Sequence, residues 1–272
     1  MHGQHTGPAS ATSAPFAGAL ILYGHPVSWH FPAVSGREEK SMKCIEHMSS
    51  EANRPRLISK FRKTERTLLS VFMRALELIP SVRADFLKKC GYGAGLSSRF
   101  AAHMEVSYSS EKYPDGRPDG LMTCQYASRA WAAFIEAKAD KFSIRTDQIE
   151  GYAELASMLG VNAVISISNE FARSPSEPPY HLSAGKRRGR DVFHFAWADI
   201  RTMFELHRFD GNLPALEAAI LDDCLNYFRD SASGILTYDS MPSEWPKFVQ
   251  SAGVGVGLPS KTPGITEIVR GW

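Results

Sequence analysis

The end of one apolar segment constrains this chain more than any other feature. Residues 130–135, Ala-Trp-Ala-Ala-Phe-Ile, form a short apolar run that predicts a buried strand, and Glu136, Ala137 and Lys138 follow it at once. Because alternate residues of a strand share a face, Glu136 and Lys138 are expected to point one way and Ala137 the other. The sequence therefore predicts a carboxylate and an ammonium group side by side at a strand end.

A second carboxylate precedes this strand. Pro118 and Asp119 come directly before residues 120–123, Gly-Leu-Met-Thr, which predict a neighbouring strand joined to the first by a short hairpin. This pairing would put Asp119 beside Glu136. Two carboxylates with Lys138 within reach are what a hard divalent cation and an attacking water need to cleave a phosphodiester bond.

The next predicted element adds two polar side chains. Residues 143–159 predict a helix, on which Gln148 and Tyr152 lie four residues apart and share one face. Tyr152 has two interpretations, packing in the core and hydrogen bonding toward the charged strand end. The sequence leaves both of them open.

An acidic residue also lies at the start of the first helix. Residues 60–79 predict this helix, which Pro80 ends, and its apolar stripe includes Leu69. Glu65 lies one turn before Leu69 on that stripe, so the helix would aim a carboxylate inward. The alternative is a first-turn glutamate that the helix dipole favours and that has no part in a site.

In this order and spacing, these residues resemble the PD-(D/E)xK nuclease superfamily, and most closely its RecB-like branch, over roughly residues 63–207. That branch combines an upstream acid, an Asp, a D/E-x-K strand and Q-x-x-x-Y on the following helix. The matching positions are Glu65, Asp119, Glu136, Lys138, Gln148 and Tyr152. The chain also resembles a group of uncharacterised bacterial nuclease-like proteins that share Ile-Glu-Ala-Lys, at residues 135–138, and Asn-Glu-Phe, at residues 169–171.

The resemblance implies a fold and an activity. The fold is α/β, with a restriction-endonuclease-like core of a mixed central sheet flanked by helices, followed by a helical C-terminal extension. The activity is hydrolysis of phosphodiester bonds, dependent on Mg²⁺ or Mn²⁺. The expected substrate is DNA, and defence or repair is the expected setting, which the resemblance itself does not indicate. The alternative is a catalytically silent nuclease-like fold that binds nucleic acid or regulates a partner.

The resemblance also implies a role for each residue. The implied metal ligands are oxygen donors: Glu65, Asp119, Glu136 and the Ala137 carbonyl. Lys138 would orient or help deprotonate the attacking water and would stabilise the charged transition state. Gln148 would position Lys138 or a phosphate, and Tyr152 would donate a hydrogen bond from behind the site.

Three segments are expected along the chain. Residues 1–55, rich in Gly, Ala, Ser, Pro and His without a sustained period, predict a disordered segment or an overextended start. Residues 56–209 predict the nuclease-like domain, and residues 210–272 predict a helical and irregular extension packed on it. The further predicted helices span residues 81–89, 198–207 and 214–230, and the predicted strands span residues 102–108, 117–124, 131–138, 161–168 and 191–195.

The distribution of charge says more about partners than its sum. A net charge of +2 is too small to indicate nucleic acid by itself. However, basic residues cluster before the first helix, at Arg54, Arg56, Lys60, Arg62, Lys63 and Arg66. A second cluster comprises Lys186, Arg187, Arg188 and Arg190. Each cluster predicts either contacts to the phosphates of DNA or a solvated loop. A homodimer or a partner subunit is a further expectation.

Other patterns exclude several classes of protein. The four cysteines are widely separated and predict reduced thiols, which fits a cytoplasmic protein. No apolar run approaches the ~18 residues of a membrane span, so no membrane partner is expected. The histidines have no zinc spacing, and no G-x-S-x-G motif indicates a serine hydrolase.

Overall fold

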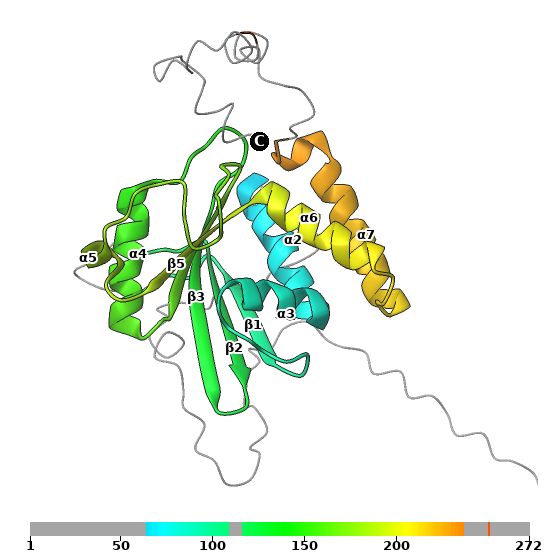
Figure 1. The fold of residues 1–272 in the computed structure, drawn as a ribbon, viewed down its shortest axis with the longest axis horizontal. Helices are drawn as coiled ribbons and strands as arrows, with labels where there is room; N and C mark the ends of the chain where they lie inside the picture. The colour runs from blue at the N-terminus through cyan, green and yellow to red at the C-terminus, as the bar shows by residue number, and fades with distance from the viewer. Residues whose placement is uncertain (1–63, 109–115, 237–249, 251–272) are drawn as a thin grey trace, which may run out of the picture. The chain divides into compact units, whose positions relative to one another are not determined.

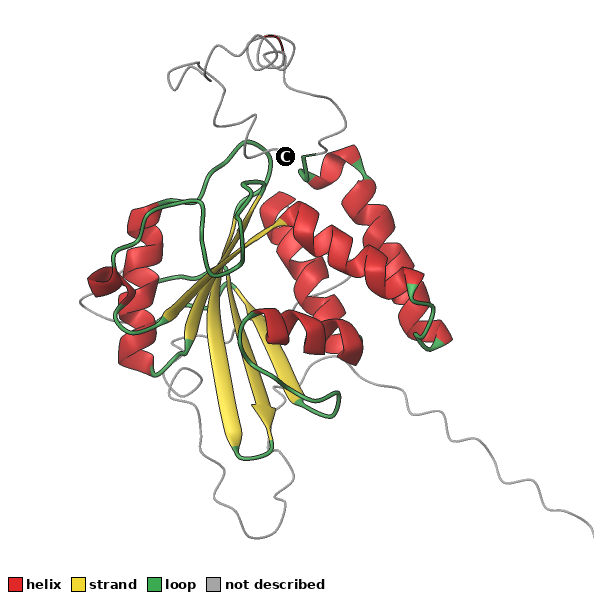
Figure 2. Cartoon of the chain, viewed as in Figure 1, coloured by secondary structure: helices red, strands yellow, loops and turns green. Residues whose placement is uncertain are grey.

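The computed structural model of the chain describes residues 64–108, 116–236 and 250. These residues form an α/β fold in which one five-stranded sheet has helices on both faces (Figure 1; Figure 2). The predictions for residues 1–55, for most of residues 231–272 and for the first basic cluster except Arg66 lie outside the described residues.

The sheet is mixed, as the sequence predicts. Its strands lie in chain order, β1-β2-β3-β4-β5. Strand β2 pairs antiparallel with both β1 and β3. Strand β4 pairs parallel with β3, and β5 pairs parallel with β4. The bounds are Arg99–Met104 for β1, Gly120–Tyr126 for β2, Arg129–Ala137 for β3, Ala163–Ser168 for β4 and Asp191–Ala196 for β5. The predicted α/β class with a mixed sheet between helices is therefore confirmed.

Helices form two layers around this sheet. One layer contains α4 (Thr146–Leu159) and the one-turn helix α5 (Ala184–Arg187), which occupies part of the predicted basic loop. The other layer contains α2 (Thr64–Leu78), α3 (Pro80–Lys89), α6 (Trp197–Phe209), α7 (Ala215–Arg229) and the 3-10 turn η1 (Ser231–Ser233). Pro80 ends α2 and is also the first residue of α3, where its missing N–H costs no hydrogen bond.

Alternation along β3 decides which layer each of its side chains meets. Ala133 and Ile135 lie in the apolar core that α2, α3, α6 and α7 share. Ala132 and Phe134 lie in the second core, which α4 covers. Glu136 has the parity of Phe134 and therefore belongs to the α4 side of the sheet.

The first strand is shorter than predicted at its end. Residues 102–108 predict a strand, but β1 stops at Met104 because Glu105 takes a left-handed backbone conformation with φ of 53°. The Glu105 N–H then donates a 2.7 Å hydrogen bond to the Asp119 carbonyl. The end of β1 is thus attached to the loop that leads into β2.

The helices of the larger layer pack through aromatic side chains. Phe228 of α7 stacks on Phe204 of α6 at 5.4 Å between ring centroids, and Phe72 of α2 meets Trp197 edge-on at 6.3 Å. Burying one such side chain contributes about 1.5–3 kcal/mol. Helix α7 therefore packs on the same core as α2 and α6.

Two predictions from the sequence, reduced cysteines and the lack of a membrane-spanning segment, can be compared with the described residues. The three described cysteines, Cys90, Cys124 and Cys224, are buried free thiols, and burial raises the pKa of each. In the part of the chain that the structure describes, no helix combines the length and apolar character needed to cross a bilayer.

Candidate functional site

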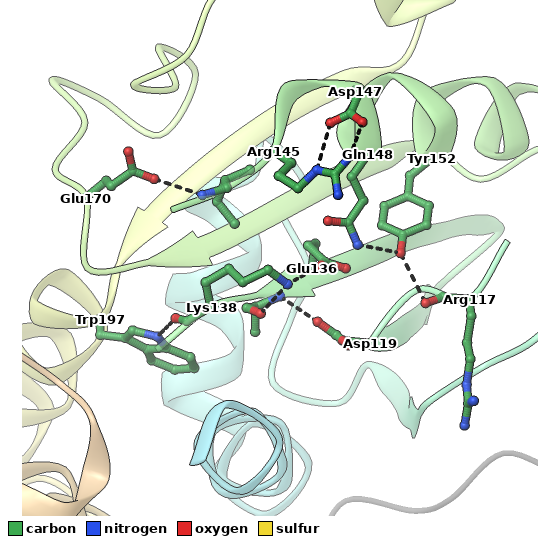
Figure 3. Close-up of polar contacts among 12 residues, drawn as sticks. Arg117, Asp119, Glu136, Lys138, Arg145, Asp147, Gln148, Tyr152, Glu170 and Trp197 are labelled. Atoms are coloured by element: carbon green, nitrogen blue, oxygen red, sulfur yellow. Dashed lines mark hydrogen bonds and ion pairs between the residues drawn. The ribbon is translucent and has the colours of Figure 1, made fainter. Parts of the chain in front are cut away.

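Glu136 and Lys138 lie at the end of β3 on the face that α4 covers (Figure 3). Glu136 is 1 % exposed, so its carboxyl group is almost fully removed from water. The Lys138 Nζ forms an ion pair with Glu136 Oε1 and donates a hydrogen bond of 3.2 Å to the Ala137 carbonyl. The alternation predicted from the sequence thus produces a buried charge pair at a strand end.

Asp119 comes from the loop before β2 and lies beside this pair. Gly120 pairs with Ile135 across the two strands, so the next position of this register sets Asp119 opposite Glu136. The Ala137 N–H donates a 3.0 Å hydrogen bond to Asp119 Oδ2 (Figure 3). The structure therefore brings together both carboxylates, the lysine and the Ala137 backbone.

Burial and charge both act on the Glu136 carboxyl. Removal from water, the larger cause, and repulsion from Asp119 raise its pKa from the ordinary value of 4.5 to about 7. The ion pair with Lys138 acts in the opposite direction but is outweighed. Its second oxygen, Oε2, is buried and has no partner in good hydrogen-bond geometry among the described residues, and the nearby Tyr152 hydroxyl acts on this carboxyl only to lower its pKa in part. A buried carboxylate oxygen without a donor is costly, and a cation or a proton would satisfy it.

Lys138 is held in its charged form. Burial acts to lower its pKa, but the nearby charges of Glu136, Asp119 and Glu65 outweigh this effect and raise the pKa above its ordinary value. Lys138 is therefore an ammonium group at neutral pH and acts as a hydrogen-bond donor.

Gln148 and Tyr152 reach the site from α4, as their helical spacing predicts. The Gln148 side chain donates a 3.0 Å hydrogen bond to the Tyr152 hydroxyl, which donates in turn to the Arg117 carbonyl at 3.1 Å (Figure 3). Burial, which is the larger cause, and the charge of Glu136 both raise the pKa of Tyr152, so the hydroxyl keeps its proton. Tyr152 both packs in the core and holds the backbone two residues before Asp119.

Gln148 bonds to Tyr152 in this arrangement, whereas the resemblance implies that it positions Lys138 or a phosphate. The Lys138 side chain contacts Glu136 and the Ala137 carbonyl. The role of Gln148 toward Lys138 or a phosphate stays a prediction.

Two backbone anchors of Lys138 were missed by the sequence reasoning. Its N–H donates to the Ile167 carbonyl on β4 at 2.8 Å, and its carbonyl accepts a 2.7 Å hydrogen bond from the Trp197 indole. Trp197, the first residue of α6, is fully buried. The available signal was the tryptophan itself, because a buried indole N–H needs an acceptor.

Glu65 lies in the first turn of α2, which packs on the opposite face of the sheet from Glu136. Its charge reaches Lys138 and helps to raise the pKa of that lysine. In residues 64–108, 116–236 and 250, however, no three acidic, histidine or cysteine side chains form a group that could hold a metal ion. The structure therefore brings two carboxylates together and leaves Glu65 at the side.

Two of the four side chains of the second basic cluster pair with glutamates of α4. Lys186 pairs with Glu150 at 2.9 Å, and Arg188 lies 3.8 Å from Glu154. The other two side chains bond to backbone carbonyls, Arg187 to that of Leu182 and Arg190 to that of Val161. These contacts favour a structural role for the cluster over phosphate binding.

The asparagine and glutamate of the Asn-Glu-Phe triplet hold the loops around the site. Asn169 donates to the carbonyls of Asp140 and Gly234, at 2.9 and 2.8 Å, and so joins the loop after β3 to the turn after α7. The Glu170 carboxylate accepts a 3.0 Å hydrogen bond from the Ile144 N–H (Figure 3). Both residues therefore fix the segment between Lys138 and α4.

A row of polar residues continues from Glu136 across the sheet. Ser166 of β4 pairs in register with Glu136, and His194 of β5 pairs with Ser166. The Ser166 hydroxyl is 2.9 Å from His194 Nδ1 and 2.7 Å from the Tyr180 hydroxyl, and His194 Nε2 donates to the Glu170 carbonyl. Burial lowers the pKa of His194, which is therefore a neutral, satisfied core histidine.

Comparisons with known proteins add no family to this geometry. Neither a scan against protein-family models nor a search of curated proteins finds a match to the chain.

Proposed function

We propose that this chain is a metal-dependent nuclease that hydrolyses phosphodiester bonds in DNA. The observation that carries the proposal is the buried Glu136 oxygen without a partner, beside Asp119 and next to an ammonium group. This combination puts negative oxygen donors and a positive donor at one strand end. Such a pairing suits a cation, a water and a phosphate together.

The donor set fits Mg²⁺ or Mn²⁺. Asp119, Glu136 and the Ala137 carbonyl are all oxygen donors, which hard cations prefer, and Mg²⁺ keeps several waters when few protein ligands hold it. A cation would satisfy Glu136 Oε2 and relieve the repulsion between the two carboxylates. When bound, it would polarise a water and neutralise charge on the phosphate oxygens.

The side chains of the chain supply the remaining functions. Lys138, held as an ammonium, donates a hydrogen bond to the attacking water or to a phosphate oxygen that gains charge. Trp197 and Ile167 hold the Lys138 backbone, so the position of its side chain is defined before substrate arrives. Tyr152 fixes the loop that carries Asp119 through the Arg117 carbonyl.

Cleavage of linear, circular and single-stranded DNA with Mg²⁺ or Mn²⁺ tests the proposal. Glu136→Gln and Lys138→Met should each lower the rate by roughly 10²- to 10³-fold, the size expected for lost electrostatic stabilisation. Lys88→Met is the matched control, because Lys88 is an exposed lysine of α3 in the other helical layer. Absence of cleavage on every substrate, or equal rates in the two site variants and the control, would contradict the proposal.

One observation favours a second function, a silent nuclease-like module that binds nucleic acid. The ion pair between Glu136 and Lys138 satisfies both charges in part without any bound cation. If the chain is a silent module, wild type and Asp119→Ala should bind DNA equally well, and Mg²⁺ should not change the affinity of either protein. A nuclease should instead lose its metal-dependent cleavage in Asp119→Ala.

A further inference from the structure

Two arginines from different elements converge on one glutamate next to the candidate site. Arg66 of α2 lies 2.8 Å from Glu105 Oε1, and Arg117 lies 3.3 Å from the same oxygen. The Glu105 side chain is only 11 % exposed, whereas the Arg117 side chain is 61 % exposed. A largely buried carboxylate thus holds two guanidinium groups, one of them open to solvent.

This cluster is joined directly to the loop that carries Asp119. The Glu105 N–H donates to the Asp119 carbonyl at 2.7 Å, and Arg117 is two residues before Asp119 in the chain. Glu105 makes these contacts from a left-handed backbone conformation, which is unfavourable for a non-glycine residue and persists only where its surroundings enforce it. The Tyr152 hydroxyl fixes the Arg117 carbonyl from the other side.

The charges of this cluster do not cancel. Lys186 and Arg188 of the second basic cluster each have their own glutamate on α4. By contrast, Glu105 is shared between two arginines, which leaves one positive charge in excess within the cluster. The Arg66 Nε is, moreover, buried without a hydrogen-bond partner in the described part of the chain.

We infer that Arg66 and Arg117 form a subsite for a phosphate of the nucleic-acid backbone, adjacent to the phosphate that is cleaved. The inference deepens the proposed function and rests on it for the identity of the ligand. A guanidinium group has five N–H donors in a planar fork, so each arginine can bind Glu105 and still present donors to phosphate oxygens. Glu105 holds the two guanidinium groups together and limits their affinity for phosphate, because its carboxylate neutralises one of their two charges.

Binding of the full chain to a fluorescent 20-nucleotide DNA, in EDTA so that no metal-dependent cleavage occurs, tests this subsite across a range of KCl concentrations. Arg117→Ala should weaken binding about 3- to 10-fold and reduce the slope of log affinity against log salt by about 0.7–0.9, the value for one lost phosphate contact. Arg117→Lys should keep most of the slope, because it keeps the charge. Arg188→Ala, the control from the second basic cluster, removes a side chain that has its own glutamate, Glu154, 3.8 Å away, and should change affinity less than about 2-fold.

Glu105→Gln gives the opposite sign and separates charge from damage to the fold. Removing this carboxylate frees both arginines, so binding should become tighter by about 3- to 10-fold. The slope of log affinity against log salt should become steeper by about 0.7–0.9, the value for one added phosphate contact. A variant that merely disturbs the fold would bind more weakly. Unchanged binding in Arg117→Ala, or weaker binding in Glu105→Gln, overturns the subsite.

The proposed function and the subsite can fail separately. If wild type cleaves DNA with Mg²⁺ while Arg117→Ala binds and cleaves like wild type, the nuclease stands and the subsite is wrong. If wild type never cleaves but Arg117→Ala and Glu105→Gln shift binding in opposite directions, the subsite stands and the nuclease is wrong. If wild type does not bind the DNA at all, the subsite is overturned.

Discussion

The buried carboxyl of Glu136 predicts an unusual dependence of stability on pH in the metal-free protein. Its pKa in the folded protein is about 7, against an ordinary value of 4.5. The folded state therefore binds more protons than the unfolded state between these two pH values. By linkage, the free energy of unfolding should fall as the pH rises through this window and level off above it.

The magnitude follows from the same two values. Each pKa unit corresponds to about 1.4 kcal/mol, so the loss from this group approaches roughly 3 kcal/mol between pH 4.5 and pH 8. Lys138 does not mask this change, because its raised pKa places its own titration above the window. Glu136→Gln removes the titrating group, and its stability should lack this component of the pH dependence.

The assay is urea unfolding followed by far-UV circular dichroism, at pH steps from 4.5 to 8.5 in EDTA. The informative quantity is the unfolding free energy of wild type minus that of Glu136→Gln, since titrating groups that do not interact with Glu136 cancel in this difference. Glu150→Gln is the control: its side chain is 30 % exposed and paired with Lys186, a surface interaction worth at most about 1 kcal/mol. Mg²⁺ at pH 8 should stabilise wild type and leave Glu136→Gln little changed.

A difference that stays level across the range would refute the reasoning, because burial would then not disfavour the ionised carboxyl. A difference that moves in favour of wild type as the pH rises would be a stronger refutation. It would show that the ion pair with Lys138 outweighs both the burial of Glu136 and its repulsion by Asp119.

Three further predictions concern the surroundings of the site. Trp197→Phe keeps a ring but leaves the buried Lys138 carbonyl without its donor, which should lower the unfolding free energy by about 1–3 kcal/mol in urea titrations. Asn169→Ala removes the amide hydrogen bonds to the carbonyls of Asp140 and Gly234, although the direct bond from the Asp140 N–H to the Gly234 carbonyl remains, and should cost roughly 2–4 kcal/mol in the same assay. Glu65→Gln should reduce the Mg²⁺-induced rise in Tm less than Asp119→Asn does, because Glu65 acts on the site only by its charge, from the other helical layer. If Glu65→Gln shows the same Mg²⁺-induced rise in Tm as wild type, the charge of Glu65 does not contribute to metal binding.

Local patterns predicted the elements that carry the candidate site. The apolar run before Glu136 and the spacing of Gln148 and Tyr152 are periodic features, and the structure has a strand and a helix there. The hairpin register that sets Asp119 beside Glu136 also follows from neighbouring residues, because a short connection restricts how two strands pair.

Contacts between distant residues were not predictable in this way. The left-handed conformation of Glu105 is not a property of glutamate and depends on the loop before β2. The pairing of Lys186 with Glu150 requires two helices to meet, so the sequence could not distinguish a cluster engaged in internal contacts from a phosphate site. Which layer Glu65 joins is likewise decided by the packing of α2 on the sheet.

The bond between Trp197 and the Lys138 carbonyl has a consequence for how the chain matures. It joins residues 59 positions apart, and the Asn169 contact to Gly234 spans 65 positions. At a synthesis rate of about 5–20 residues per second, Trp197 is made roughly 3–12 seconds after Lys138. During translation the strand end therefore exists before its last anchors, and a partly synthesised chain does not yet carry a finished site.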